Sequence, residues 1–291
     1  WRIRPSLTLN LGLRWEPGTG PVEVNNLYAN VRNVLDAAPN TSAPFWEQDT
    51  WKNLAPRFGF AWSPLASGKT SVRGGAGLFY SELDAIMYSD PATRVAPLFA
   101  DYQVSDATLL SQFPDALAVI SAFRTGSYGA ADTVQFHNLK NPHTLQYNIN
   151  VQQQIGNSSV LSLGFVANRG INLSSYGDYN ISKAFHDGVS LAIDSTAKRL
   201  NPNFEAMSIA STRGDSWYDG LTVAYKRQFS AGLQAQVSYT WSKVISTADN
   251  PGKTDRTGSG GGNIAYTYDP SVSKGVSGYS VGRVLNVNYS Y

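Results

Sequence analysis

The feature that most constrains this chain is an alternation of apolar and polar residues that returns along most of its length. In 6–16, SLTLNLGLRWE, every odd position from Leu7 to Trp15 is large and apolar, and every even position is polar or glycine. Successive side chains of a β-strand point to opposite faces, so this period of two predicts a strand with one apolar face. Whether that face meets a protein core or lipid decides what kind of protein the chain forms.

The same alternation appears in seven further segments. In 144–154, for example, large apolar residues at the odd positions from 145 to 151 alternate with Gln and Asn. Most of these segments have the roughly 9–11 residues that cross a bilayer when a strand is tilted. We therefore predict an all-β fold with about eight to ten meandering antiparallel strands. The other segments are 55–63, 69–80, 160–168, 221–229, 232–241 and 283–291.

The lengths of the connections favour a transmembrane β-barrel. An outer-membrane barrel has short turns on its periplasmic rim and long loops on its outer rim. Unstructured loops above ~12–15 residues are uncommon inside compact soluble domains. We interpret the chain as a partial barrel wall with short turns on one rim and long loops on the other. The short connections are 64–69, 155–159 and 230–231, and they alternate with the long segments 17–54, 81–143, 169–217 and 242–280.

Composition excludes several other classes of protein. Charged residues make up 15% of the chain, against roughly 25% in soluble domains. No apolar run approaches the ~18–20 residues that a membrane helix needs, so a helical membrane protein is excluded. The absence of cysteine excludes disulfides and thiolate metal sites. A formal net charge of +2 is too small to indicate a nucleic-acid partner.

One apolar set of side chains is expected to face outer-membrane lipid. Amide-rich rows such as Gln146, Asn148 and Asn150 alternate with it, as the lining of an aqueous lumen would. The predicted lipid-facing residues are Leu7, Leu9, Leu11, Leu13, Phe58, Phe60, Leu145, Ile149, Val151, Leu161, Leu163, Leu221, Val223, Val237, Leu285 and Val287.

Aromatic residues gather near the predicted strand ends. Amphipathic rings favour the two membrane–water interfaces, and several rings stand where a strand enters a long segment or adjoins a short turn. The predicted aromatic girdle is Trp15, Trp62, Tyr80, Phe229, Tyr239 and Trp241.

The long segments are expected to hold any ligand contacts. Asp215 and Asp219 flank Trp217 and Tyr218, a combination of rings and carboxylates that suits a polar ligand. Start and stop signals also predict short helices within 105–126 and 188–200.

The chain shows no catalytic or metal-binding motif. Its three histidines, His137, His143 and His186, are joined by no cysteine and no cluster of glutamates, so we interpret them as polar residues rather than metal ligands. No nucleophile stands with a base, and no pair of carboxylates stands with a histidine, in a recognisable arrangement. We expect a protein that is not an enzyme and has no cofactor.

Three hairpins resemble those of a known family. Segment 53–80, NLAPRFGFAWSPLASGKTSVRGGAGLFY, is similar to the signature hairpin of the Oar-like TonB-dependent receptors. Segments 141–170 and 216–243 resemble the next two hairpins, the last with its S-Y-T-W-S-K ending, and SLTLNLGLRWE resembles the strand that precedes them. The segment before the last strand departs from the family pattern, because GYSVGRV has Arg283 but no histidine.

The resemblance implies an outer-membrane receptor of a Gram-negative bacterium that binds a ligand with its outer loops and imports it through the barrel lumen. Such a barrel has about 22 strands, an N-terminal plug and a link to the TonB complex. This chain shows neither plug nor TonB-interacting segment, does not begin with Met, and has fewer strands. We therefore expect 1–291 to be a fragment of the barrel domain, with TonB contacted through the missing N-terminal part. The resemblance leaves the identity of the imported ligand open, and oligosaccharides and peptides are the candidates.

Two alternatives remain at this stage. The ending YSY resembles the aromatic-ended terminal strand of complete outer-membrane barrels, and eight strands is a known complete size. The chain would then be a small barrel with a structural or adhesive role. A soluble β-sandwich that binds carbohydrate through Trp and Tyr loops is the other alternative.

Overall fold

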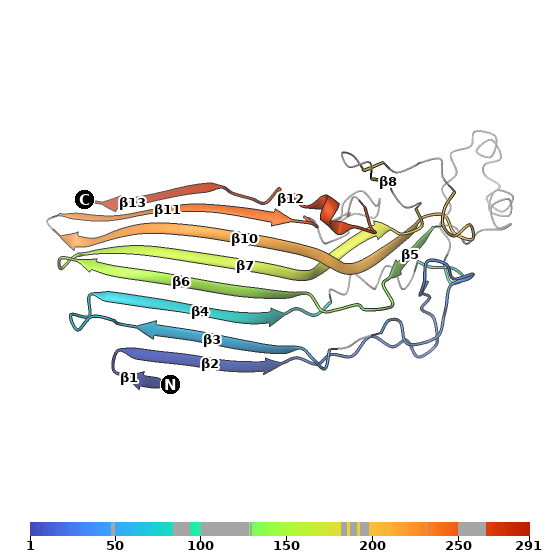
Figure 1. The fold of residues 1–291 in the computed structure, drawn as a ribbon, viewed down its shortest axis with the longest axis horizontal. Coiled ribbons are helices and arrows are strands. Elements are labelled where there is room, and N and C mark those ends of the chain that lie inside the picture. Colours follow the sequence, from blue (N-terminus) through green and yellow to red (C-terminus); the bar gives the residue numbers. More distant parts are fainter. Residues whose placement is uncertain are drawn as a thin grey trace.

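The computed structural model describes residues 1–47, 50–83, 94–99, 128, 130–181, 185–186, 191–192, 198–230, 232–249 and 266–291. Its main feature is one sheet of eleven strands (Figure 1). The eight long strands are β2 (Leu7–Trp15), β3 (Leu54–Trp62), β4 (Thr70–Tyr80), β6 (His143–Ile155), β7 (Ser159–Asp178), β10 (Met207–Ser230), β11 (Leu233–Ser246) and β13 (Arg283–Ser290).

Shorter elements complete the described chain. The sheet also contains β1 (Arg2–Arg4), β5 (Ala131–Val134) and β12 (Gly275–Val276). β8 (Phe185–His186) and β9 (Leu191–Ala192) form a separate pair, and a 3₁₀ turn, η1, spans Pro270–Ser273. β9 lies inside 188–200, so the helix predicted there is wrong for those two residues. The helix predicted within 105–126 falls outside the described residues.

The long strands follow one another in the sheet as they do in the sequence. The order is β1-β2-β3-β4-β6-β7-β10-β11, after which β12 and β13 both pair with β11. Every pairing is antiparallel except that of β5 with β10. This antiparallel meander confirms the predicted fold class.

The three short connections all lie at one end of the sheet, which we call the turn end. Gly68 and Gly156 lie in the first two with a positive φ of +66° and +62°, and Gly232, with +82°, lies between the end of β10 and the start of β11, one residue beyond the predicted 230–231. Side chains with a Cβ rarely adopt this conformation. The long segments leave from the opposite end, which we call the outer end (Figure 1). The alternation of short and long connections is therefore present as predicted.

Three strands are longer than the alternation indicated. β7 continues to Asp178 and β10 begins at Met207, so much of the expected long loop 169–217 is strand. β11 likewise continues to Ser246, beyond the predicted end at 241. The reason is physical: the alternation of apolar side chains marks where one face meets an apolar environment, whereas the ladder of backbone hydrogen bonds continues past it.

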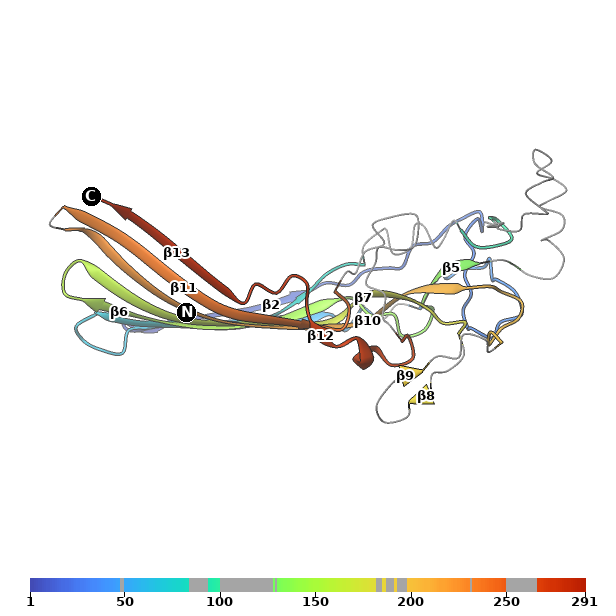
Figure 2. The ribbon, with the colours of Figure 1, turned by 90° about the horizontal axis from the view of Figure 1, so that it is seen from above.

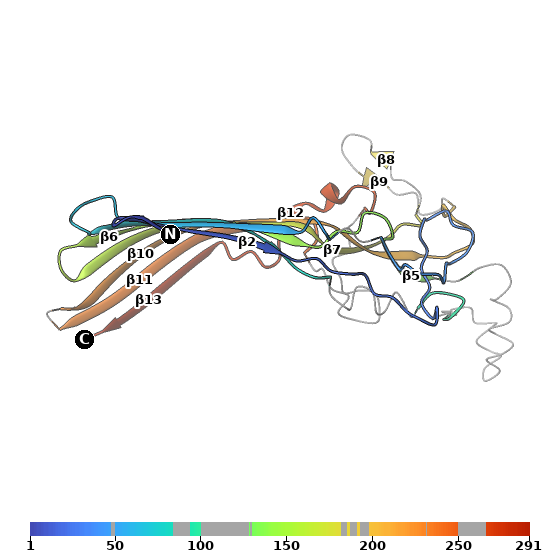
Figure 3. The same cartoon turned by 90° about the horizontal axis from the view of Figure 1, so that it is seen from below.

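Seen along its edge, the sheet is a single curved layer (Figures 2 and 3). The described parts of the long segments gather beyond its outer end and form a cap there. In the described chain, β2 and β13 are not paired with each other, because they lie near opposite edges of the sheet.

The cap has two buried apolar clusters around the extended ends of β7 and β10. One contains Phe45, Trp46, Val134, Phe136, Leu139, Tyr176 and Ala210, and the other contains Ala29, Val31, Val95, Ala131, Phe204, Met207 and Ile209. Met207 and Ile209 alternate with Ala210 along β10, so the two clusters use opposite faces of these strands. The sheet thus has a conventional core only at its outer end.

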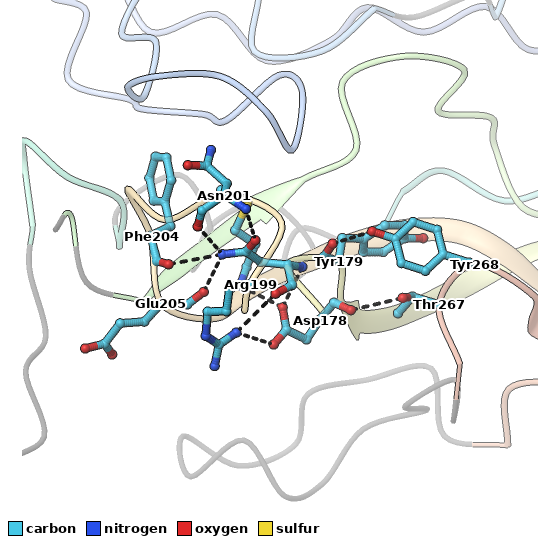
Figure 4. A network of polar contacts seen from close by, with 10 residues as sticks. Asp178, Tyr179, Arg199, Asn201, Phe204, Glu205, Thr267 and Tyr268 are labelled. Carbon is cyan, nitrogen blue, oxygen red and sulfur yellow. Dashed lines mark hydrogen bonds and ion pairs between the residues drawn. The ribbon is translucent and has the colours of Figure 1, made fainter. Parts of the chain in front are cut away.

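A polar network centred on Asn180 ties the cap together (Figure 4). The Asn180 side chain is fully buried. Its Nδ2 donates to the carbonyls of Asn201, Phe204 and Glu205 at 2.9, 3.1 and 2.7 Å. Its Oδ1 accepts the Asn201 N–H at 2.7 Å. Both functional atoms of one buried amide are therefore satisfied by the segment that leads into β10.

The network reaches two further long segments. Asn201 Nδ2 donates to the carbonyls of Val34 and Asp36 at 2.7 and 2.8 Å. On the other side, Thr267 Oγ1 donates to the Asp178 carbonyl at 2.9 Å, and the Tyr268 hydroxyl donates to the Tyr179 carbonyl at 2.6 Å. Burial, followed by the charges of nearby acidic groups, raises the pKa of Tyr268, so its hydroxyl stays a donor.

We expect the substitution Asn180→Ala to loosen the cap without unfolding the sheet. It leaves three buried carbonyls and one buried N–H without their partner, so the free energy of opening this region should fall by about 3 kcal/mol. Hydrogen exchange measured by mass spectrometry should then be faster at residues 33–37 and 199–207. Asn288→Ala, on exposed β13, is the matched control. Unchanged exchange at these segments in Asn180→Ala would contradict the role of the network.

Candidate functional site

The register places all sixteen predicted lipid-facing residues on one face of the sheet. A single row across the strands reads Leu7, Trp62, Val72, Val151, Leu163, Val223, Tyr239 and Leu285. The remaining members lie an even number of residues from this row, and therefore on the same side. Twelve of the sixteen are exposed, and the other four (Leu7, Leu9, Phe60 and Val237) are half-buried. We call this surface the apolar band.

The opposite face is polar. Four amide side chains of β6 lie on it, between two neighbouring strands. The β6 residues are Gln146, Asn148, Asn150 and Gln152, and they face Gly77, Gly75, Arg73 and Ser71 of β4 and Asn168, Val166, Gly164 and Ser162 of β7. On β3 and β4 a tight arrangement occurs at Gly77, where a Cβ would lie 3.0 Å from the Phe79 ring. The space left by Gly77 lets the Arg57 guanidinium lie over that ring, 4.5 Å from its centroid. We call this surface the polar face.

The apolar band runs obliquely across the strands. In β2 the band begins at the row named above, on the side of the turn end, and continues outward through Leu9, Leu11 and Leu13 to Trp15. In β13 the same row is the outermost part of the band, which continues toward the turn end through Val287 and Tyr289. Its centre therefore shifts by about one residue per strand. At ~3.3 Å per residue and ~4.8 Å between strands, this corresponds to a tilt of about 35° between the strands and the normal to the band.

Ionisable residues mark the outer limit of the band. On successive strands from β13 to β6, the first ionisable residue beyond the apolar run is Arg283, Lys243, Asp219, Arg169 and His143. Each lies outward of the one before it or level with it, so they follow the same oblique line. Side chains on the turn-end side of this line are apolar, and those on it are charged or titratable. A membrane surface imposes this division on a tilted strand.

The predicted girdle residues are distributed along both limits and within the band. Trp15 and Tyr80 end β2 and β4 at the outer end, and Trp62 ends β3 beside a short turn. Trp241 lies just below Lys243, with a side chain that is 62% exposed. Tyr239 lies between Val223 and Leu285, inside the band. Phe229 falls in β10, outside the described side chains.

The four predicted ligand contacts do not form one site. All lie in β10 rather than in a loop. Trp217 and Asp219 point to the face of the apolar band, where Asp219 pairs with Arg169 at 2.6 Å. Tyr218 points to the polar face, where its ring covers Gly220. The Asp215 carbonyl accepts the N–H of Thr247 at 2.9 Å, and the Asp215 N–H donates to the Thr247 hydroxyl at 2.8 Å. Their role in ligand binding stays a prediction.

Two adjoining hollows lie at the outer end, and sequence reasoning did not find them. One of about 640 Å³ lies between residues 16–22 and 80–83, with the carboxylates of Glu16 and Glu82 in its lining. The other, of about 400 Å³, shares Tyr80 and Asn141 with it. Their lining residues come from different long segments, so no local sequence motif predicts these hollows.

The described residues place limits on other chemistry. Across them, no three residues of the types His, Cys, Asp and Glu come together as a metal site would need. No helix in the same residues is long and apolar enough to cross a membrane.

Comparison with known proteins gives a family match over the whole chain. The family model described as "Outer membrane beta barrel domain" matches residues 1–291. No curated protein matches the chain.

Three solved structures are similar to parts of the chain. The outer membrane transporter YddB from Escherichia coli is 12% identical with a TM-score of 0.42, over 68% of this chain and 21% of that one. The FrpB iron transporter from Neisseria meningitidis (F3-3 variant) is 14% identical with a TM-score of 0.33, over 66% and 19%. The siderophore receptor PirA from Pseudomonas aeruginosa is 12% identical with a TM-score of 0.38, over 84% and 34%. The chain thus spans about a fifth to a third of these proteins.

We expect a positive charge in the centre of the apolar band to block assembly in a bilayer. Ile149→Arg places a guanidinium at mid-band, which should cost about 2–4 kcal/mol of folding free energy in lipid. Asn148→Arg is the matched control, because its neighbouring position puts the same group on the polar face. Urea titration of protein folded into vesicles measures both. Equal stability of the two variants would contradict the assignment of the faces.

Proposed function

The chain belongs to the outer membrane β-barrel domain family and lies in the outer membrane of a Gram-negative bacterium, and from this premise we propose that it forms part of the wall of a TonB-dependent importer. In this proposal the apolar band contacts lipid and the polar face lines the lumen or meets a plug. The cap, outside the cell, makes the first contact with the ligand. The observation that carries the proposal is the division of one sheet into these two faces, with all long segments at one end.

The open edges of the sheet support a larger parent barrel. Within a bilayer, backbone N–H and C=O groups on an unpaired strand edge each cost several kcal/mol, so a membrane sheet must close on itself. The described strands do not achieve this closure, since β2 and β13 are unpaired with each other. A receptor barrel of about 22 strands supplies the missing partners, and residues 1–291 are then a fragment of its barrel domain. The TonB complex would act through an N-terminal part outside this chain. The hairpins at 53–80, 141–170 and 216–243 support membership of the Oar-like group.

The two hollows at the outer end are the proposed point of ligand entry. Tyr80 offers a ring that is shared by both, and Glu82 offers a carboxylate to hydroxyl or amine groups. The carboxylate of Glu16, in the same lining, is paired with Arg14 at 2.7 Å. Rings together with carboxylates and amides suit sugars and peptides alike. An oligosaccharide or a short peptide is therefore the proposed cargo, and we propose no catalytic role.

The mass of the native polypeptide tests the proposal most directly. We expect the protein recovered from the outer membrane to have a mass several times the 31.6 kDa of residues 1–291. A native mass near 31.6 kDa, with heat-modifiable migration on a gel, would instead indicate a complete small barrel with a structural or adhesive role.

We expect import to depend on the proton-motive force and on the larger hollow. Uptake of fluorescently labelled oligosaccharides and of tri- to hexapeptides by whole cells should stop after uncoupling. The pair of changes Tyr80→Ala and Glu82→Gln should lower the apparent affinity about thirtyfold, because each removes a contact of about 1 kcal/mol. Glu205→Gln, an exposed acid outside the hollow, is the control. Uptake unaffected by uncoupling would exclude a TonB-driven importer.

A further inference from the structure

A third hollow lies on the face of the apolar band, away from the proposed ligand entry. It has a volume of about 480 Å³ and is lined mainly by apolar atoms of Phe165, Leu221, Trp241 and Val276. Leu221 and Trp241 are the outermost apolar residues of the band on β10 and β11. The hollow therefore lies at the outer limit of the band, where acyl chains end and headgroups begin.

One exposed cation lines this hollow, and two more lie near it. Lys243 lines it directly, next to Trp241 on the same face of β11. Arg283 lies opposite Trp241 across the β11–β13 pair. Lys274, at the end of η1, holds its ammonium 4.2 Å from the centroid of the Trp217 ring, and Trp217 is paired with Ile245 two residues beyond Lys243.

The nearby carboxylates are already engaged elsewhere. Asp219 accepts from Arg169 at 2.6 Å. Asp249 accepts the N–H of Gly278, also at 2.6 Å. Asp269 caps η1 by accepting from the N–H and hydroxyl of Ser271. Asp219 lines the hollow beside Lys243, and Asp249 and Asp269 keep their negative charges while they accept these hydrogen bonds. Lys243, Lys274 and Arg283 are therefore distinguished by having no ion-pair partner among the described residues.

We propose that this hollow binds lipopolysaccharide, the phosphorylated glycolipid of the outer leaflet. An acyl chain lies against Phe165, Leu221 and Trp241, and the phosphates contact the three cations above. Charge and depth both match such a lipid. Along β11 the apolar groove and Trp241 are followed outward by Lys243, and Arg283 lies level with Trp241 on β13. The proposal uses the outward orientation of the cap proposed above, but it does not depend on import.

The test measures binding of purified lipid A to the detergent-solubilised, delipidated protein by native mass spectrometry. The triple change Lys243→Gln, Lys274→Gln and Arg283→Gln should weaken binding on the order of a hundredfold, since each interfacial cation contributes comparably. Arg2→Gln, Arg4→Gln and Lys69→Gln together form the control, because they remove the same charge at the turn end. Equal loss in the control would overturn the proposal.

Lipid A without phosphates tests the source of affinity. It should bind the unmodified protein about as weakly as intact lipid A binds the triple variant. Equally tight binding with and without phosphates would mean that the groove acts alone, and would overturn the proposed headgroup contact. If the triple variant fails to migrate as a heat-modifiable barrel, Lys243→Gln alone serves, with an expected weakening of about fivefold.

Orientation is checked independently of lipid binding and of import. Residues 1–291 contain no cysteine, so Tyr279→Cys introduces one thiol beside the hollow, at a side chain that is 71% exposed, and the unsubstituted protein is the labelling control. Labelling of whole cells by a membrane-impermeant maleimide is expected. Labelling without lipid A binding overturns this inference alone, whereas a thiol accessible only from the periplasm overturns the orientation and both proposals.

Discussion

Lateral hydrogen bonding between strands is the constraint on which the rest of this structure depends. A bilayer offers no water to satisfy the backbone, so each strand must use both neighbours for its N–H and C=O groups. Once the register is set, every side chain is assigned to a face, because a shift by one residue would exchange the two faces. The apolar band, the polar face and the line of charges from Arg283 to His143 all follow from that register.

The fold could be predicted from sequence because apolar residues alternate with polar ones along each long strand. The runs from Leu7 to Trp15 and from Leu145 to Val151 show this alternation, and the structure places both on one face. The alternation stops where the cap begins. β7 and β10 therefore extend beyond the predicted limits, to Asp178 and from Met207, into a region where protein packs on both faces. Apolar residues such as Met207, Ile209 and Ala210 lie there on both faces, so the sequence does not mark one apolar and one polar face.

The candidate sites were less predictable because they depend on residues far apart in the chain. Asn180 joins segments near Val34, Asn201 and Thr267, and an isolated asparagine in a polar stretch carries no signal of that role. Trp217 and Tyr218 looked like a pair from their adjacency, but neighbours in a strand face opposite ways. The cations at the lipid-side hollow were also missed, since Lys243, Lys274 and Arg283 come together only through the pairing of β11 with β12 and β13.

The oblique course of the apolar band has a consequence for how such walls change in size. A shift of about one residue per strand sets the lean of the strands, whereas the curvature of the sheet, and not the lean, sets how many strands close the ring. A hairpin added to or removed from this wall would therefore change the diameter of the pore while each remaining residue kept its depth. Trp15, Trp241 and Lys243, for example, would each keep its own depth in the membrane. The number of hairpins in the wall could therefore vary without a change in the height of the wall.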